Sequence, residues 1–426
     1  MLLSFSVSNF KSFRDEQVLD LTASALKPAF SWLENAAVPM GKEESALRVK
    51  AIYGANASGK SNLIAALQVF VGVARFSAMN KELILGVTPY GLDVAVSDAP
   101  SKFKVTFVVE GKHYEYGMLL DHERIHREWL HDTTIKRAEV YLREGMEVKF
   151  NDKYFRNNAS IKLLTQSENQ LFRENSTFLS ALSLFPQKNA SLATIQFFSD
   201  ILVINDAESA VTEQKAYEML GNDSELLKKT KNLLRFGDIN FDQLFAIDRD
   251  AAKQVELDPG IIDQLQRSRG RYSLLATHKV QGSDELVMSW LTEKGESQGT
   301  QKMLILAPYI IKIIESGGIL IIDEFEAKLH TRLSREIVAM FNSATGNPNN
   351  AQFIFATHDT NLLDHKLLRR DQIDFVEKGE DRTSEIYSLS DVKGIRKEAD
   401  FESDYLGGSY GAVPDVTDFN IAILED

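Results

Sequence analysis

The fold is decided by a phosphate-loop motif that fills positions 54–61: Gly54-Ala55-Asn56-Ala57-Ser58-Gly59-Lys60-Ser61. An apolar stretch over 49–53 precedes the motif, and apolar residues at helical spacing follow it over 61–76. A glycine loop between a buried strand and a helix turns successive backbone N–H groups toward phosphate oxygens. We therefore expect the loop and the first helical turn to bind a nucleotide through Gly54, Asn56, Ser58, Gly59, Lys60, Ser61 and Asn62.

A second apolar strand ends in two carboxylates: Gly318-Ile319-Leu320-Ile321-Ile322-Asp323-Glu324. A strand that is buried on both faces can place polar side chains only at its exposed carboxyl end. We expect Asp323 and the hydroxyl of Ser61 to hold Mg²⁺, while Glu324 orients and deprotonates the attacking water. Lys60 would act in catalysis by contacting the β- and γ-phosphates of ATP. The alternative is a core strand that ends in solvated acids.

The composition is that of a globular protein with an acidic balance. The 426 residues include 48 Lys and Arg against 61 Asp and Glu, which gives a net charge of −13. This charge argues against a nonspecific nucleic-acid coat, although a local basic groove is compatible with it. The absence of cysteine excludes disulfides, thiolate zinc sites and cysteine nucleophiles. No signal peptide or membrane-length apolar run is found, so we expect a cytoplasmic protein without a membrane partner.

The apolar pattern divides the chain into three parts. Alternation predicts antiparallel N-terminal strands over 2–7, 18–21, 103–109, 113–120 and 125–130. Helical periods predict helices over 177–183, 192–203 and 213–234, after which strands resume at 241–247 and 272–280. The last third alternates apolar strand with amphipathic helix, which is typical of a mostly parallel sheet. We therefore expect an α/β head formed by 1–150 and 241–426, with a mainly helical insertion at 151–240.

Asp323 follows Lys60 by 263 positions, which leaves room for an arm or an extra domain between the two motifs. This spacing resembles that of the ABC-class heads of the SMC and RecF group. The stretch Asn9-Phe10-Lys11-Ser12-Phe13 resembles their N-terminal element, and Glu296-Ser297-Gln298-Gly299-Thr300-Gln301-Lys302 resembles a degenerate ABC signature. The apolar strand over 353–357 is followed by His358, which resembles a switch histidine.

These segments imply further site residues. In such heads a basic residue of the N-terminal element approaches the nucleotide, here Lys11. Ser297 and Gly299 would bind the γ-phosphate of ATP held by the opposite subunit, at a helix N-terminus. His358 would contact the γ-phosphate, and the stretch 326–330 occupies the place of the D-loop. A Q-loop glutamine cannot be placed.

Together these features resemble an ABC/SMC-like P-loop ATPase head with a mixed sheet, and more narrowly the AAA-family ATPases of the OLD/RecF-like branch. That branch includes the RloA-, Septu- and PARIS-type ATPases of bacterial anti-phage defence. The tail segments 368–378 and 405–414 also resemble the branch, with departures at Asp374 and Ser409. Because only about 70 residues follow His358, we expect no C-terminal nuclease domain of the OLD kind.

The resemblance implies a nucleotide-driven switch or sensor in an abortive-infection system. Two heads of a homodimer, or of a higher homo-oligomer, would enclose ATP and control a separately encoded effector such as a nuclease. The alternative is a RecF-like repair ATPase that binds DNA through a basic groove. A third hypothesis is a scaffold that binds ATP structurally and hardly hydrolyses it.

Overall fold

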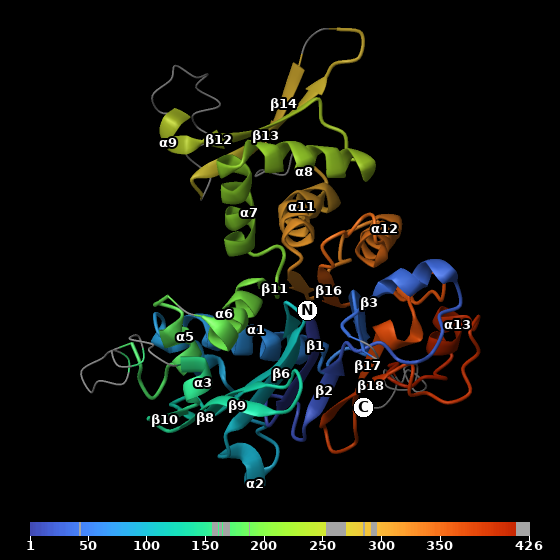
Figure 1. The fold of residues 1–426 in the computed structure, drawn as a ribbon. Helices are drawn as coiled ribbons and strands as arrows, with labels where there is room; N and C mark the ends of the chain where they lie inside the picture. Colours follow the sequence, from blue (N-terminus) through green and yellow to red (C-terminus); the bar gives the residue numbers. More distant parts are fainter. Residues whose placement is uncertain are drawn as a thin grey trace, which may run out of the picture.

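The computed structural model describes residues 1–41, 44–155, 161, 164, 171–186, 188–252, 270–283, 286–290 and 296–414. The described chain forms a larger lower lobe, which contains the N-terminus, and a smaller upper lobe (Figure 1). The lower lobe is built around two sheets. No helix among the described residues is long and apolar enough to cross a bilayer.

The N-terminal sheet is antiparallel and has the spatial order β10-β9-β8-β7-β6-β1-β2. Its strands are β1 Leu2–Ser8, β2 Gln17–Asp20, β6 Ser101–Val109, β7 Lys112–Leu120, β8 Ile125–Asp132, β9 Ala138–Glu144 and β10 Glu147–Phe150. The predicted pairing of the first two strands and the predicted meander from β6 to β8 are confirmed.

The central sheet has the spatial order β11-β15-β16-β5-β17-β18, and its strands run parallel except for the edge strand β18. Its strands are β5 Val49–Tyr53, β11 Ile201–Ile204, β15 Ile319–Ile322, β16 Gln352–Ala356, β17 Ile373–Lys378 and β18 Ser384–Ser388. The predicted α/β fold, a mixed sheet with antiparallel N-terminal strands and a parallel core, is confirmed. A parallel sheet needs cover on both faces, and this requirement fixes the layers around it.

The predicted insertion over 151–240 contains a strand as well as helices. The described helices are α3 Asp152–Phe155, α5 Phe178–Leu182, α6 Asn189–Ser199, α7 Ala210–Asn222 and α8 Ser224–Phe236. Residues 192–203 were expected to be helical throughout, but α6 ends at Ser199 and the run Ile201–Ile204 pairs in parallel with β15. Branched apolar residues stabilise the fold more when they extend a buried sheet than when they lengthen an exposed helix. The division of the chain into domains remains a prediction.

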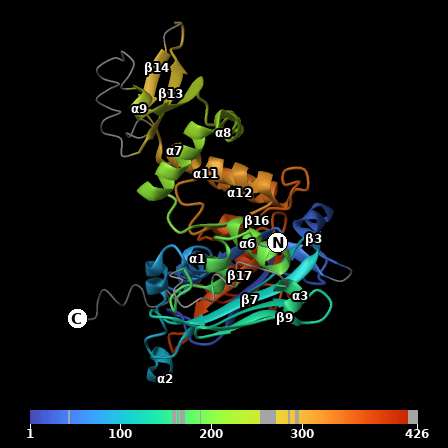
Figure 2. The same cartoon turned by 60° about the vertical axis from the view of Figure 1, so that its left-hand side comes forward.

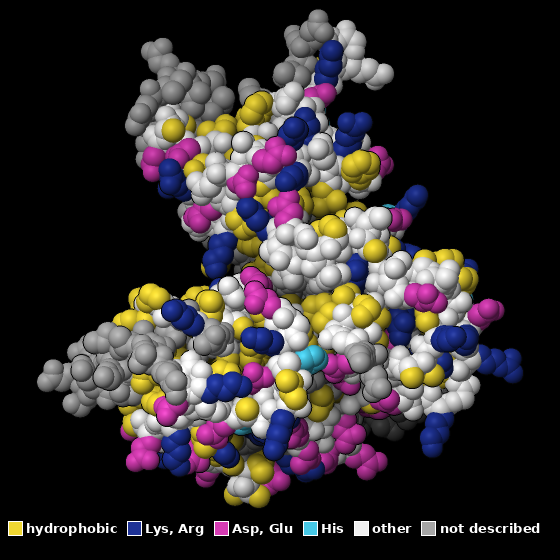
Figure 3. Space-filling view, viewed as in Figure 1, with side chains coloured by type: hydrophobic (Ala, Val, Ile, Leu, Met, Phe, Trp, Pro, Cys, Tyr) yellow, Lys and Arg dark blue, Asp and Glu magenta, His cyan; other side chains and the backbone are white. Residues whose placement is uncertain are grey.

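The upper lobe consists of α7, α8 and a small antiparallel sheet. Its remaining elements are β12 Gln243–Asp248, α9 Arg249–Ala252, β13 Tyr272–Lys279 and β14 Leu286–Trp290. The long helix α11 Gln298–Ser316 packs against α7 and α8 and connects this lobe to the central sheet (Figure 2). Positive and negative side chains alternate over the visible surface of the upper lobe (Figure 3).

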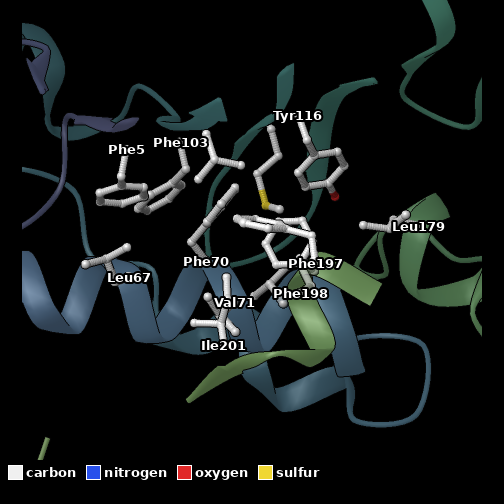
Figure 4. Close-up of a cluster of buried hydrophobic side chains, with 14 of the residues drawn as sticks. Phe5, Leu67, Phe70, Val71, Phe103, Tyr116, Leu179, Phe197, Phe198 and Ile201 are labelled. Carbon is white, nitrogen blue, oxygen red and sulfur yellow. The ribbon is translucent and has the colours of Figure 1, made fainter. Parts of the chain in front are cut away.

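Two apolar layers cover the central sheet. On one face, α1 Lys60–Phe76 lies between the two sheets, and Phe70 contacts the rings of Phe5, Phe103 and Phe198 at 5.5–5.9 Å between centroids (Figure 4). On the other face lie α11, α12 Thr331–Asn342 and α13 Phe401–Leu406. The strand residues alternate between the layers: Ile52 belongs to the first cluster, whereas Ala51 and Tyr53 belong to the second.

Smaller elements complete the described structure. They are β3 Ala37–Pro39, β4 Ser45–Leu47, α2 Val94–Ser97 and the 3-10 helices η1 Ser31–Ala36, η2 Lys81–Gly86, η3 Thr360–Leu362 and η4 Arg370–Gln372.

Candidate nucleotide-binding site

Three neighbouring parallel strands bring the predicted motifs to one edge of the central sheet. The phosphate loop follows β5, His358 follows β16 and Asp323 follows β15, and β16 pairs with both other strands. The strands end in register, with Ala356 opposite Ile52 and Ile322 opposite Phe355. Because parallel strands direct their carboxyl ends to the same edge, motifs that are far apart in sequence meet there.

The backbone of the phosphate loop has positive φ angles at its two glycines, Gly54 and Gly59. Gly54 has φ 152°, and a Cβ at this position would lie 2.2 Å from the carbonyl oxygen of Val376. Gly59 has φ 123°, and a Cβ there would lie 2.5 Å from Oγ of Ser384. Helix α1 begins at Lys60, so its unpaired N–H groups face the loop. The loop therefore has the geometry of an anion site.

Lys60 is the cation of this site and is only 5 % exposed. Its Nζ donates hydrogen bonds to the carbonyl oxygens of Gly54 (2.7 Å) and Ala55 (3.0 Å), so the ammonium group lies across the loop. Burial lowers the pKa of Lys60, and the charges of Asp323, Glu324 and Glu326 oppose this shift. The acidic residues that follow β15 therefore act electrostatically on the lysine of the phosphate loop.

Asp323 and Ser61 supply oxygen atoms that fit a magnesium ion. Burial raises the pKa of Asp323, a hydrogen bond with Ser61 lowers it, and the charges of Glu324 and Lys60 act in opposite directions. Oδ1 of Asp323 is buried and has no hydrogen-bond partner among the residues that the structure describes. A carboxylate and a hydroxyl are ligands that Mg²⁺ accepts, and the unpaired carboxylate oxygen is the atom that an ion would satisfy.

Glu324 is exposed, and its backbone has a left-handed conformation, with φ 49°, that residues other than glycine rarely adopt. Its carbonyl oxygen accepts a hydrogen bond from Nζ of Lys302 at 2.8 Å, and this lysine is buried. A left-handed conformation at a glutamate is strained, and such strain persists where the surrounding structure enforces it. The turn after β15 therefore presents the carboxylate of Glu324 to solvent, beside the loop.

His358 lies at the same edge through a contact with Glu326. The backbone N–H of His358 donates to Oε1 of Glu326 at 2.8 Å, whereas Oε2 of Glu326 is buried without a hydrogen-bond partner in the described part of the chain. Burial and the charge of Lys60 lower the pKa of His358, while nearby carboxylates raise it. The net shift favours a neutral imidazole, which can donate one hydrogen bond and accept another.

The N-terminal turn 9–13 lies against the start of α1. Nδ2 of Asn62 donates to Oγ of Ser12 at 2.9 Å. Lys11 next to it is exposed, and its Nζ lies 5.7 Å from the ring centroid of Phe10. The structure therefore brings this turn to the loop, while the ammonium group of Lys11 rests on a neighbouring ring. In the loop itself, Asn56 is exposed, and the hydroxyl of Ser58 is buried with no hydrogen-bond partner from the described residues.

The predicted signature segment contacts the turn after β15. Ser297 is exposed and caps α11 by accepting a hydrogen bond from the N–H of Thr300 at 3.2 Å. Gly299 lies so close to the same turn that a Cβ would be 2.7 Å from the carbonyl oxygen of Lys328. The contacts of Ser297 and Gly299 thus join them to α11 and to the acidic turn. The other predicted residues are linked in pairs: Asp323 and Glu324 act electrostatically on Lys60 and on His358, and Ser61 forms a hydrogen bond with Asp323.

Two polar residues at this site had no predicted role. Lys302 is the last residue of the predicted signature segment, and its Nζ donates to the carbonyl oxygen of Glu324. A lysine at the start of an apolar helical run was the sequence signal that could have indicated this role. Asn205 directly follows β11, the strand next to β15 in the central sheet. Its Nδ2 donates to Oε1 of Gln68 in α1, and its Oδ1 is buried without a hydrogen-bond partner among the described residues. An asparagine directly after an apolar run could have indicated it, but only if 201–204 had been interpreted as a strand.

A phosphate loop and an acidic strand end at one edge of a parallel sheet define the class of P-loop nucleotide-binding proteins. The chain belongs to the ATPase family described as "AAA domain, putative AbiEii toxin, Type IV TA system", whose family model matches residues 50–364. No curated protein matches the chain.

Two solved structures are similar to the chain at low identity. An SMC head bound to the C-winged helix domain of ScpA has 13% identity and a TM-score of 0.43, covering 91% of this chain and 97% of its own. The SMC head domain from Thermotoga maritima has 14% identity and a TM-score of 0.41, and the match covers 91% of this chain and 98% of that structure.

Proposed function

We propose that the chain binds ATP with Mg²⁺ at the carboxyl edge of β5, β16 and β15 and hydrolyses it. One observation carries this proposal: the neighbouring parallel strands β5, β16 and β15 end in register, so the phosphate loop and Asp323 lie at one edge of the sheet although 263 positions separate Lys60 from Asp323. Family membership supports ATP as the nucleotide. Both motifs would therefore act on one triphosphate.

Each side chain of the site has a role that follows from its place. Lys60 and the N–H groups of the loop would neutralise the phosphates, and Ser61 with Asp323 would hold Mg²⁺. The ion supplies Lewis-acid charge at the phosphate oxygens when bound. Glu324 would orient the attacking water and accept its proton, and the neutral His358 would donate a hydrogen bond to the γ-phosphate.

The signature segment supports a pair of heads. Ser297 is exposed at the N-terminus of α11, where the helix dipole favours an anion. Through Gly299 and Lys302 the same helix touches the turn that carries Glu324. A phosphate bound at Ser297 by a second subunit would therefore act on the helix that positions Glu324. We propose a homodimer in which ATP is enclosed between heads.

The biological role that we favour is a switch in bacterial anti-phage defence. The description of the family names a toxin and a toxin–antitoxin system, which supports abortive infection as the context. The ATPase would then control a separately encoded effector. A RecF-like repair ATPase is the alternative, and the net charge of −13 argues against it. Duplex DNA binding that requires ATP and weakens steeply with salt would favour that alternative.

Magnesium-dependent ATP binding tests the site directly. Calorimetry of the full chain should show tighter ATP binding with Mg²⁺ than with EDTA, because the ion links the phosphates to Asp323. Asp323→Asn should lose most of this gain, whereas Asp391→Asn, an exposed aspartate in the C-terminal region, should keep it. An unchanged magnesium gain in Asp323→Asn would remove Asp323 from the site.

A further inference from the structure

Two serines near opposite ends of the chain close around the phosphate loop. We define the clasp as Ser12, in the turn 9–13, and Ser384, the first residue of β18. The backbone N–H of Ser384 donates to the carbonyl oxygen of Ser12 at 2.8 Å, and its hydroxyl donates to the carbonyl oxygen of Ser58 at 2.5 Å. The hydroxyl of Ser12 accepts the bond from Asn62. The clasp therefore contacts both the loop and the first turn of α1.

Both halves of the clasp are firmly anchored. Phe10 and Phe13 flank the turn that carries Ser12; both rings are fully buried, and their backbones pair at 2.8 and 2.9 Å. Tyr90 links the β17–β18 hairpin to this turn: its backbone N–H donates to Oδ1 of Asn9 at 3.1 Å, and its hydroxyl donates to the carbonyl oxygen of Asp381 at 3.0 Å. Ser384 itself is buried. Its hydroxyl is therefore held in place by the surrounding structure.

The bond from Ser384 fixes the orientation of a backbone donor in the loop. The C=O and N–H of a planar trans peptide point in opposite directions. Because the carbonyl of Ser58 is turned toward Ser384, the N–H of Gly59 in the same peptide is turned away from it. A Cβ at Gly59 would lie 2.5 Å from Oγ of Ser384 and 3.0 Å from Oγ of Ser12, so the clasp also requires glycine here.

We propose that Ser384 is a positioning residue for nucleotide binding, because its hydroxyl sets the Gly59 N–H in the orientation that receives a phosphate oxygen. Backbone N–H groups of such a loop are the donors that cradle phosphate. This inference rests on the proposed function, namely that the loop binds the phosphates of ATP. Ser12 and Ser384 both lie outside residues 50–364, so the family match does not contain the clasp.

The test compares two serines of the same strand. Ser384→Ala removes the bond to the loop, whereas Ser388→Ala removes a bond to the carbonyl oxygen of Ile373 at the far end of β18. In the full chain, Ser384→Ala should raise the Kd and the KM for ATP by about threefold to tenfold, the effect of one hydrogen bond, with kcat changed less than about twofold. Ser388→Ala should leave all three unchanged. Ser384→Thr keeps a hydroxyl and should restore most of the affinity.

The outcomes separate this inference from the proposed function. Unchanged ATP affinity in Ser384→Ala overturns the clasp, and so does an equal loss in Ser388→Ala, which would indicate general weakening of the strand. Lys60→Ala is measured in parallel with the same calorimetry. If Lys60→Ala loses ATP binding while Ser384→Ala keeps it, only the clasp fails. If Lys60→Ala also binds ATP normally, the proposed function itself fails.

Discussion

The nucleotide edge and the upper lobe use charge in opposite ways. At the nucleotide edge, formed by loop 54–61 and the carboxyl ends of β5, β15 and β16, burial lowers the pKa of Lys60 and raises the pKa of Asp323, and the charge of each group opposes the shift of the other. The ion pairs of the upper lobe lie at the surface, where they are screened: Arg271–Asp248, Lys312–Asp223 and Lys229–Glu315. Chemistry therefore concentrates where distant strands end together, because charges interact strongly only where water is excluded.

The largest expected effect is on hydrolysis at the nucleotide edge. Glu324→Gln removes the proposed base and should lower kcat by about 10²- to 10⁴-fold while ATP binding is retained. The variant should then accumulate as an ATP-bound dimer, measured by light scattering after gel filtration. Glu315→Gln, which alters an exposed glutamate paired with the upper lobe, is the matched control and should hydrolyse ATP normally. Equal turnover in Glu324→Gln and the unaltered chain would refute the role of Glu324.

Binding should depend on the buried cation of the loop. Lys60→Ala removes a charged donor to the phosphates and should weaken ATP affinity by about 10- to 100-fold in calorimetry. Lys112→Ala replaces an exposed lysine of β7 and should not change the affinity. Normal ATP binding by Lys60→Ala would show that the loop does not hold the triphosphate.

The sequence predicted the strand before the phosphate loop and the strand that ends at Asp323, because the residue types of these segments leave few alternatives. Glycines at 54 and 59 followed by a lysine at 60 are typical of a phosphate-binding loop. An apolar run that ends at Asp323 can expose its acidic side chains only at the end of a strand. The strand β11 was missed because Ile201–Ile204 is short and follows a helical pattern directly. The clasp could not be predicted, since nothing local marks Ser12 or Ser384 as neighbours of the loop.

The strands that lead to the nucleotide edge carry a buried ion pair that gives a stability test. Nζ of Lys50 in β5 lies 2.6 Å from Oδ1 of Asp374 in β17, and both side chains are buried. Lys50→Met leaves the carboxylate without its partner and should lower the free energy of unfolding by about 3–5 kcal/mol, measured by urea denaturation. Replacing both partners, Lys50→Met with Asp374→Leu, should recover most of this loss.

The same pair predicts a pH dependence. Burial raises the pKa of Asp374 to about 6, although Lys50 opposes the shift. An acid whose pKa is raised by folding stabilises the fold at low pH, and this stabilisation is lost as the pH rises through the folded-state value. Lys50→Met removes the opposing charge, so its destabilisation should be larger at about pH 8 than at about pH 5. A pH-independent loss would contradict this account of the pair.

The smallest effect is expected from the upper lobe. Lys229→Ala breaks the exposed pair between α8 and Glu315 of α11, and exposed pairs are screened by solvent and salt. Its melting temperature and kcat should match those of the unaltered chain within error. A loss comparable to that of Lys50→Met would show that the surface charges of the upper lobe are as important as those of the nucleotide edge.

A structure of the Glu324→Gln variant with ATP and Mg²⁺ would test the meeting of the two motifs most directly. The account predicts one nucleotide whose phosphates contact Lys60 and the loop, with the metal ion held between Ser61 and the carboxylate of Asp323. A nucleotide bound elsewhere, or an ion at the triphosphate that Asp323 does not approach, would contradict it.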